Sequence, residues 1–480
     1  MTDPARRKGL ALALLASTQF VLILDAAIVG VALPSIGPDL GFAREDLSWV
    51  PNAYTLMFGG FLLLGGRIAD LTGRRRMFIA GLVLFTAASL AGALAQSPLW
   101  LVIARAVQGL GAALVSPAAL SLVMTLFTDG SERNRALGVW GAVAGSGGAA
   151  GVILGGFLTE WLSWQAVLYV NVPIGIAAAL LATRLLPEGR EAAGTRSFDV
   201  AGAVSVTAGL ALLVYAFVDA NDAGWGSVQT LGLVAVALAL LVVFVIIELR
   251  ARRPLVPLGI FRNRPLRGSN IVSILVTMGL FPMFFFLTFY TQNVLGYSPI
   301  ESGLAQLPIA LSIIVSAGVA SQLVTRVGYK PTMIVGLVVA AIGLFWFAQI
   351  SPGGSFLADV LGPSIVTGFG AGFGFVASTI AATTGVSGEQ AGLASGLVNT
   401  SQQIGGALGL GVLVALQTAR TDAVGGAPPV ALTEGYQVGF AGAGVLILVG
   451  ALLSVFLLSS RESREHAEAA RRGELEPVAA

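Results

Sequence analysis

Residues 10–36 read LALALLASTQFVLILDAAIVGVALPSI, an apolar run in which Asp25 is the single charged residue. A helix of this length is about 40 Å long, which is enough to cross the roughly 30 Å apolar core of a bilayer. Arg6, Arg7 and Lys8 stand directly before the run. The run is too long for the apolar core of a signal peptide, so it predicts a retained membrane helix that begins on the cytoplasmic side.

The rest of the 480-residue chain has the same character. Apolar residues make up 56% and charged residues 11%, against roughly 25% charged residues in a soluble domain, which excludes a water-soluble protein. Charged residues, Gly/Pro clusters and loop tips divide the chain into fourteen predicted spans, all of them helical. These spans are 10–36, 48–69, 76–97, 99–126, 136–159, 163–186, 199–219, 228–249, 269–292, 302–325, 331–350, 356–381, 391–418 and 435–459.

Basic residues are distributed unequally between the two sides of this predicted bundle. Lys8, Lys330 and twenty-two arginines fall on the side of the N-terminus, whereas Arg44 and Arg420 fall on the other side. Positive residues concentrate on the cytoplasmic side of membrane proteins. We therefore predict a multi-pass protein of the plasma membrane with both termini in the cytoplasm.

A faint internal repeat divides the spans into groups. The segment from Gly66 to Arg75 has a degenerate copy at residues 321–330, eight spans later. Such repeats are typical of secondary transporters, which bind substrate between their halves. The prediction is an all-α membrane fold of 6+2+6 helices. It comprises a tail at 1–9, a six-helix bundle at 10–187, an inserted two-helix region at 188–265, a second bundle at 266–460 and a tail at 461–480.

Two charged residues lie well inside predicted spans. Asp25 is near the middle of its span, where an ionised carboxylate is costly and desolvation favours the protonated form, so proton binding and release is the expected chemistry. Arg105 shares a helical face with Gln108 and would favour ionised Asp25 if the two meet. The alternative for Asp25 is helix packing, and for Arg105 it is helix packing or an outward-pointing side chain.

Residue types needed for much enzyme chemistry are missing. The chain has no Cys and a single His, His466, in the C-terminal tail. A disulfide framework is impossible without Cys. A His-based metal site or a Ser-His-Asp triad is excluded from the predicted spans, because they contain no His. We therefore expect no enzyme activity, no metal and no cofactor.

The basic turn between the second and third spans resembles motif A of the major facilitator superfamily. Its residues are Gly66, Asp70, Gly73, Arg74, Arg75 and Arg76. Arg105 to Gly111 is similar to motif B, whose Arg is associated with proton transfer, and the first span resembles that of the 14-helix drug:proton antiporter subfamily. The resemblance implies a gating role for the motif A residues and proton coupling by Asp25 and Arg105.

The fifth span resembles motif C, the antiporter motif. Its glycines are Gly138, Gly147, Gly151, Gly155 and Gly156. Val152 replaces the expected Pro, and Ala27 and Gly30 replace polar residues expected in the first span. Glycines every four residues also allow close helix packing in any membrane protein, so a purely structural role stays open.

Neutral polar residues form a stripe in the thirteenth span, which also resembles the antiporter subfamily. Such a stripe suits either a cavity wall or hydrogen bonds between helices. We expect cavity-lining side chains among Gln108, Gln292, Asn399, Gln402 and Gln403.

The resemblance implies a proton-coupled exporter that moves drugs, antibiotics or other amphipathic metabolites by alternating access. The proton gradient would supply the energy, and the partners would be a small molecule, protons and lipid, without nucleic acid. Two alternatives remain, a proton-coupled importer with the same fold and a non-transporting membrane protein.

Overall fold

The computed structural model describes residues 4–43, 46–127, 130–187, 199–251, 254, 256–386 and 391–472, and every regular element among them is helical. The elements up to the middle of the chain are α1 (Pro4–Leu40), η1 (Asp46–Ser48), α2 (Trp49–Thr72), α3 (Arg74–Ala93), α4 (Pro98–Leu126), α5 (Gly130–Trp161), α6 (Ala166–Tyr169), α7 (Asn171–Leu185), α8 (Val200–Ala223) and α9 (Val228–Arg250). The later elements are η2 (Leu258–Arg262), α10 (Arg264–Asn293), α11 (Pro299–Ala305), α12 (Leu307–Val327), α13 (Tyr329–Phe347), η3 (Phe356–Val360), α14 (Leu361–Thr383), α15 (Ala391–Val424), α16 (Pro428–Leu457) and α17 (Ser460–Arg471).

Eleven segments are long and apolar enough to cross a membrane among the described residues. The three remaining predicted spans fall on α2, α5 and α8, and each of these helices contains residues whose side chains the structure does not describe. Within α8, residues Ala201–Phe217 form a shorter apolar helix. The all-helical membrane fold is therefore confirmed, and the number fourteen stays a prediction.

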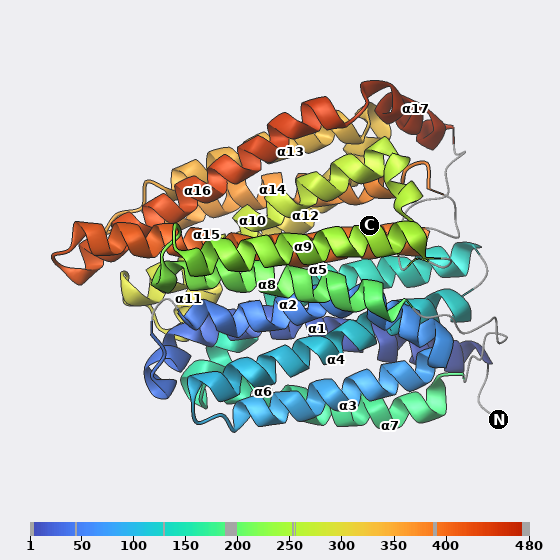
Figure 1. Cartoon of the computed structure of the whole chain (residues 1–480), viewed down its shortest axis with the longest axis horizontal. Coiled ribbons are helices and arrows are strands. Elements are labelled where there is room, and N and C mark those ends of the chain that lie inside the picture. The colour runs from blue at the N-terminus through green and yellow to red at the C-terminus, as the bar shows by residue number, and fades with distance from the viewer. Residues whose placement is uncertain are drawn as a thin grey trace.

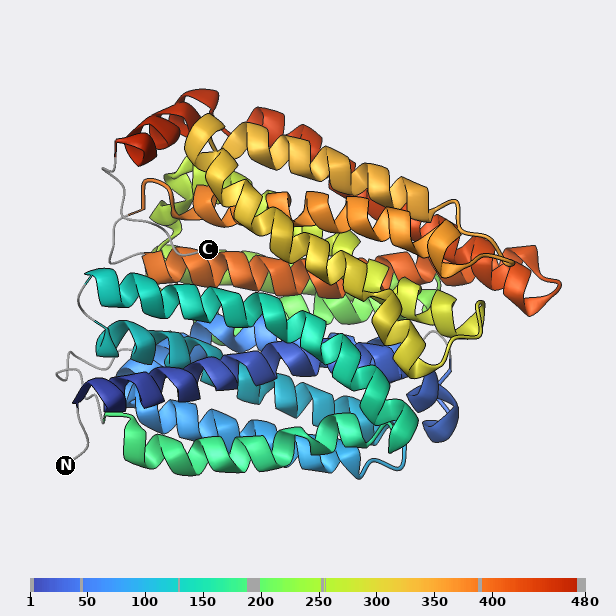
Figure 2. The same ribbon diagram turned by 180° about the vertical axis from the view of Figure 1, so that it is seen from behind.

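The long helices lie side by side in two groups (Figure 1). Helices α1–α7 form the lower group, and α10 and α12–α16 form the upper group, with α8 and α9 across the middle and α11 at the left at the level of α8. Helix α8 contacts both groups, because the Thr207 hydroxyl donates to the Gly60 carbonyl of α2 at 2.9 Å and Val214 packs with Ala407 of α15. The view from behind shows α5 and α12 along the seam on the opposite side (Figure 2).

The two groups share an apolar core toward one end of the bundle. The start of α1 and helix α17 lie at one end of the bundle, which we call the terminal end, and α6 and α11 lie at the other, the distal end (Figure 1). At the distal end a single core joins residues of both groups, including Ile28, Leu33, Trp164, Met283, Phe286 and Tyr290. Toward the terminal end, Leu14, Phe78 and Val123 belong to a separate core of the first group. The halves are therefore packed together at the distal end.

Helix α17 packs on the terminal end of the second group. Its Ser463 is buried and accepts a hydrogen bond from the Lys330 backbone N–H at 3.0 Å. Half-buried His466 lies 3.3 Å from the Thr384 hydroxyl and edge-on to the Tyr329 ring. The C-terminal segment is thus tied to the first turn of α13 and to the residue that follows α14.

We expect the docking of α17 to weaken at acid pH. Burial lowers the pKa of His466 below its ordinary value, so the docked helix favours the neutral imidazole. As the pH falls below about 6.5, protonation stabilises the undocked state and docking is lost. A spin label at Arg464→Cys should become more mobile between about pH 8 and pH 5.5, with less change in His466→Gln. Equal pH dependence in both proteins would contradict this assignment to His466.

Candidate functional site

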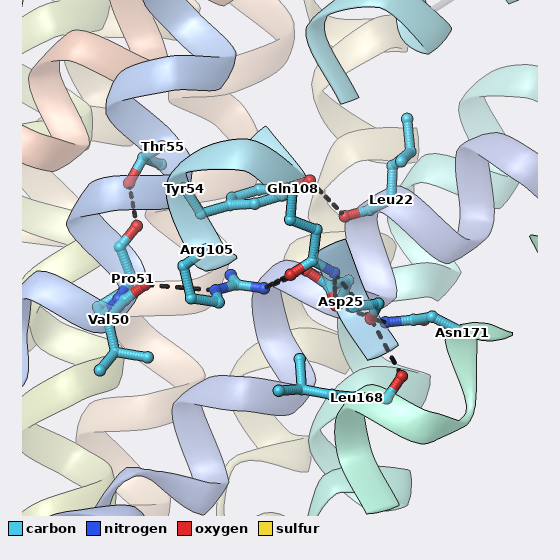
Figure 3. A network of polar contacts seen from close by, with 11 residues as sticks. Leu22, Asp25, Val50, Pro51, Tyr54, Thr55, Arg105, Gln108, Leu168 and Asn171 are labelled. Carbon is cyan, nitrogen blue, oxygen red and sulfur yellow. Dashed lines mark hydrogen bonds and ion pairs between the residues drawn. The ribbon is translucent and has the colours of Figure 1, made fainter. Parts of the chain in front are cut away.

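A closed network of polar side chains surrounds Asp25 inside the first group of helices (Figure 3). Asp25 is 0% exposed, and its Oδ2 accepts a hydrogen bond from Arg105 Nη1 at 2.6 Å. Its Oδ1 accepts from Gln108 Nε2 at 2.8 Å and from Asn171 Nδ2 at 2.6 Å. Both carboxylate oxygens are therefore hydrogen-bonded, as a buried charge requires.

The Arg105 side chain is 1% exposed, and its donors are shared among several acceptors. Nη1 also donates to Gln108 Oε1 at 2.7 Å, and Nε donates to the Val50 carbonyl at 3.3 Å. The guanidinium lies over the Tyr54 ring, 4.4 Å from its centroid, in a cation–π contact. Helix α2 can come this close because residue 109 is Gly and has no side chain. A Cβ at this position would lie 2.3 Å from the Tyr54 carbonyl oxygen, which is too close for the two atoms.

Ser89 links the outer members of this network. Its hydroxyl accepts from Asn171 at 3.0 Å and from Gln108 at 3.2 Å, and it donates to the Leu168 carbonyl at 3.0 Å. Neither Ser89 nor Asn171 is among the site residues predicted from the sequence. A signal for Asn171 exists, because it is the only Asn in the apolar run 163–186.

The network lies toward the distal end of the first group. Asn171 is the first residue of α7, and Ser89 is four residues before the end of α3. Arg105 is seven residues after the start of α4, or about 10 Å along the helix. Carboxylate, guanidinium and amides from α1, α4 and α7 thus meet at a level below the distal ends of the helices.

Helix α1 lies against α5 through the glycines of the predicted antiporter motif. A Cβ at Gly147 would lie 3.1 Å from the Ile23 Cβ, and one at Gly151 would lie 2.7 Å from the Leu24 carbonyl oxygen. A Cβ at Gly155 would lie 2.7 Å from the Ile28 carbonyl oxygen. The Asp25 helix is therefore held directly against the α5 backbone.

The same helix α5 closes the distal end against the second group. A Cβ at Gly156 would lie 2.6 Å from the carbonyl oxygen of Pro299, at the start of α11. The Glu160 carboxylate accepts from the Ile300 backbone N–H at 3.0 Å. Nearby, Gln292 of α10 donates to the Val31 carbonyl of α1 at 3.0 Å.

The predicted gating turn joins α2 to α3 at the terminal end. Gly73 connects the helices with a φ of 110°, a conformation that side chains other than Gly rarely adopt. Arg74 donates to the Thr125 hydroxyl and Arg75 to the Leu186 carbonyl. A Cβ at Gly66 would contact Pro117 at 3.4 Å. The surroundings of two predicted site residues, Asp70 and Gly138, are outside what the structure describes, although both residues are helical. Arg76 follows Arg75 in the first turn of α3.

An open cavity of about 170 Å³ lies between α14 and α15, in the half of the bundle nearer the terminal end. Its lining residues are Thr379, Thr383, Ser395, Val398, Asn399 and Gln402. The predicted cavity amides are thus divided in space. Asn399 and Gln402 line this cavity, whereas Gln108 belongs to the Asp25 network and Gln292 to the distal contact. Gln403 packs against Gly59 of α2, with 2.6 Å between its Cβ and a Cβ placed at Gly59.

Comparisons with known proteins agree with this architecture. The family model of the Major Facilitator Superfamily matches residues 15–410. The chain is 41% identical over 469 residues to the puromycin resistance protein pur8 of Streptomyces alboniger, covering 96% of this chain and 92% of that one. It is 40% identical over 450 residues to the cephamycin export protein CmcT of Amycolatopsis lactamdurans, covering 93% and 92%.

A solved structure shares the fold at low sequence identity. It is a bacterial homologue of the human lysosomal transporter Spinster, in an inward-facing and unoccupied conformation. The TM-score is 0.69 at 15% identity, and the match covers 96% of this chain and 98% of that chain.

Removing one member of the buried ion pair should destabilise the protein strongly. Arg105→Leu leaves the Asp25 carboxylate buried without its counter-charge, which costs about 3–5 kcal/mol. The double variant Asp25→Leu, Arg105→Leu removes both charges and should recover most of this loss. Denaturant unfolding in detergent measures both effects. A double variant as unstable as the sum of the two single variants would show that the charges are not coupled.

Adding one methyl group at Gly156 should open the distal contact. Gly156→Ala brings a Cβ against the Pro299 backbone, whereas Gly148→Ala on the same helix meets no atom within 4 Å and serves as the control. Because the chain has no native Cys, spin labels at Leu162→Cys and Leu304→Cys report the separation of α5 and α11 cleanly. The label distance should lengthen in Gly156→Ala alone. The same distance in both variants would contradict the assignment.

Proposed function

The chain belongs to the Major Facilitator Superfamily and is a membrane transporter, not an enzyme, and we propose that it exports amphipathic antibiotics or drugs in exchange for protons. Relatives named for puromycin resistance and for cephamycin export support the outward direction. The single observation that carries the proton coupling is the buried network in which Arg105, Gln108 and Asn171 all donate to Asp25.

In this proposal Asp25 alternates between two protonation states. The ionised carboxylate holds α1 to α4 and α7 through the donors that converge on it. A proton on one carboxylate oxygen neutralises the charge, and that oxygen no longer accepts hydrogen bonds with the same strength. Arg105 keeps the Gln108 and Val50 oxygens and the Tyr54 ring as partners, so its charge stays solvated by the protein. Protonation therefore loosens α1 without exposing Arg105.

Helix α5 offers a mechanical route from this network to the distal contact. The α1 turns on either side of Asp25 pack against Gly151 and Gly155, and the next residue, Gly156, packs against α11. A shift of α1 would move α5 and with it the contact between the halves. The two halves then rock between states that open at opposite ends, as in other secondary transporters.

We propose that the terminal end faces the cytoplasm. The excess of basic residues at the predicted loops of this end supports that orientation, as does the position of the open cavity nearer to it. Helices α2, α5 and α8 would also span the membrane, which gives fourteen spans in a 6+2+6 order with α8 and α9 bridging the halves. Substrate would enter the cavity from the cytoplasm, and the motif A residues, including Asp70 and Arg74 to Arg76, would gate this end.

The transport reaction would take its energy from the proton gradient of the plasma membrane and would use no bound cofactor. Each cycle would release substrate outside and protons inside. The Asp25 network would carry the proton while the cavity carries the substrate, which gives the two solutes separate sites in the first and second halves.

Flux measurements in proteoliposomes test this function. Purified protein is reconstituted, a pH gradient is imposed, and movement of radiolabelled puromycin is followed. Puromycin should accumulate against its own gradient on the more acidic side, as exchange for protons requires. Asp25→Asn, which is neutral at every pH, should lower the gradient-driven flux by at least about a hundredfold, the lower end of what a positioned proton-transfer group commonly contributes to a rate.

The controls separate the alternatives. Asp39→Asn, at a carboxylate that accepts from the Trp164 indole near the distal surface, should retain gradient-driven flux. Movement of substrate in the same direction as protons would instead identify an importer. Unchanged flux in Asp25→Asn would overturn the proposed role of Asp25.

A further inference from the structure

Among the residues that the structure describes, those that line the cavity between α14 and α15 are uncharged. Its walls present the hydroxyls of Thr379, Thr383 and Ser395 and the amides of Asn399 and Gln402. In the whole sequence, the charges that lie well inside predicted spans are Asp25 and Arg105. Those two charges are buried against each other, at 0% and 1% exposure. A molecule in the cavity therefore meets neutral hydrogen-bonding groups.

The two sides of the cavity differ in their hydrogen-bonding capacity. On α14, the Thr379 hydroxyl donates to the Phe375 carbonyl at 2.9 Å, and the Thr383 hydroxyl donates to the Thr379 carbonyl at 3.2 Å. Each hydroxyl has a single hydrogen, so toward a ligand these two threonines act as acceptors. The α14 wall is therefore suited to O–H or N–H groups of a bound molecule.

The α15 wall has both donors and acceptors. Asn399 and Gln402 line the cavity from successive turns, and neither amide has a hydrogen bond to another residue within the described part of the chain. Each primary amide provides two N–H donors and one carbonyl acceptor. This wall can pair with a ligand amide, or with neighbouring hydroxyl and carbonyl groups.

A permanently charged molecule would gain little binding free energy in this cavity. Moving an ion from water into an apolar environment is costly unless a counter-charge pairs with it. The only carboxylate well inside a predicted span is that of Asp25, and both its oxygens are occupied by Arg105, Gln108 and Asn171. The Arg105 guanidinium is likewise buried against Asp25 and Tyr54.

We propose that this cavity is the substrate site and that it selects uncharged molecules that carry hydroxyl or amide N–H donors beside a carbonyl acceptor. Permanent lipophilic cations bind poorly. The assignment rests on the proposed export function, because it names the substrate class of that same transporter. A weak base would enter the site in its neutral form.

Equilibrium dialysis on the full-length protein in detergent, without a pH gradient, tests this selectivity. The probes are radiolabelled chloramphenicol, an uncharged molecule with two hydroxyls and an amide, and tetraphenylphosphonium, a permanent cation. The wild-type protein should bind chloramphenicol at least about tenfold more tightly than tetraphenylphosphonium.

Charge variants sharpen the test. Asn399→Asp and Gln402→Glu place a carboxylate in the cavity and should each strengthen tetraphenylphosphonium binding about tenfold while weakening chloramphenicol binding. Gln349→Glu makes the same chemical change at an exposed position near the distal end and should alter neither affinity. Asn399→Leu should weaken chloramphenicol binding without improving tetraphenylphosphonium binding, and it serves as the second variant if a charged one fails to fold.

The assignment is overturned if the wild-type protein binds both probes equally, prefers the cation, or binds neither. It is also overturned if the cavity carboxylates leave tetraphenylphosphonium binding unchanged. These outcomes are independent of the flux experiment, because binding here needs no gradient. Selective chloramphenicol binding without gradient-driven transport would instead overturn the proposed export and leave the cavity assignment standing.

Discussion

The desolvation of one carboxylate constrains the first half of this protein. A buried charge is stable only when a counter-charge and hydrogen-bond donors replace the water that it lost. At Asp25 these groups come from α4 and α7, and Ser89 on α3 aligns two of them. Four helices must therefore meet at one point, and the glycine at position 109 lets α2 approach so that the Tyr54 ring covers the guanidinium.

The contacts around α5 place this charge network next to the contact between the halves. Helix α5 is rich in glycine. Its Gly151 and Gly155 pack against the backbone of α1, and its Gly156 packs against the backbone of α11. Such contacts transmit small shifts because there is no flexible side chain to absorb them. The Ala27 methyl group lies in the α1–α5 contact, 2.8 Å from a Cβ placed at Gly151, where a larger polar side chain would crowd the helices. The departure from the family pattern at Ala27 thus has a packing explanation.

Two polar regions of different character lie in the two halves. The Asp25 network is charged and sealed, and its polar groups are occupied mainly by one another. The cavity between α14 and α15 is neutral and open, and its amides have free hydrogen-bonding capacity toward a ligand. In the proposed exchange of substrate for protons, these two regions would serve as separate sites, each with the chemistry that suits its own solute. In the structure both halves are in contact at the distal end, while the cavity lies nearer the opposite end.

The sequence by itself determined the membrane character, the approximate spans and the two charges at the centre of the site. Hydropathy and charge are local properties, so a lone Asp25 or Arg105 stands out in an apolar run without any knowledge of packing. Only the tertiary structure decided which neutral polar residues join them. Ser89, Gln108 and Asn171 form hydrogen bonds in the Asp25 network, whereas Asn399 and Gln402 line the cavity. All of them are uncharged residues on helices, and what such a residue contacts depends on which neighbouring helix its face meets, which is set by long-range packing.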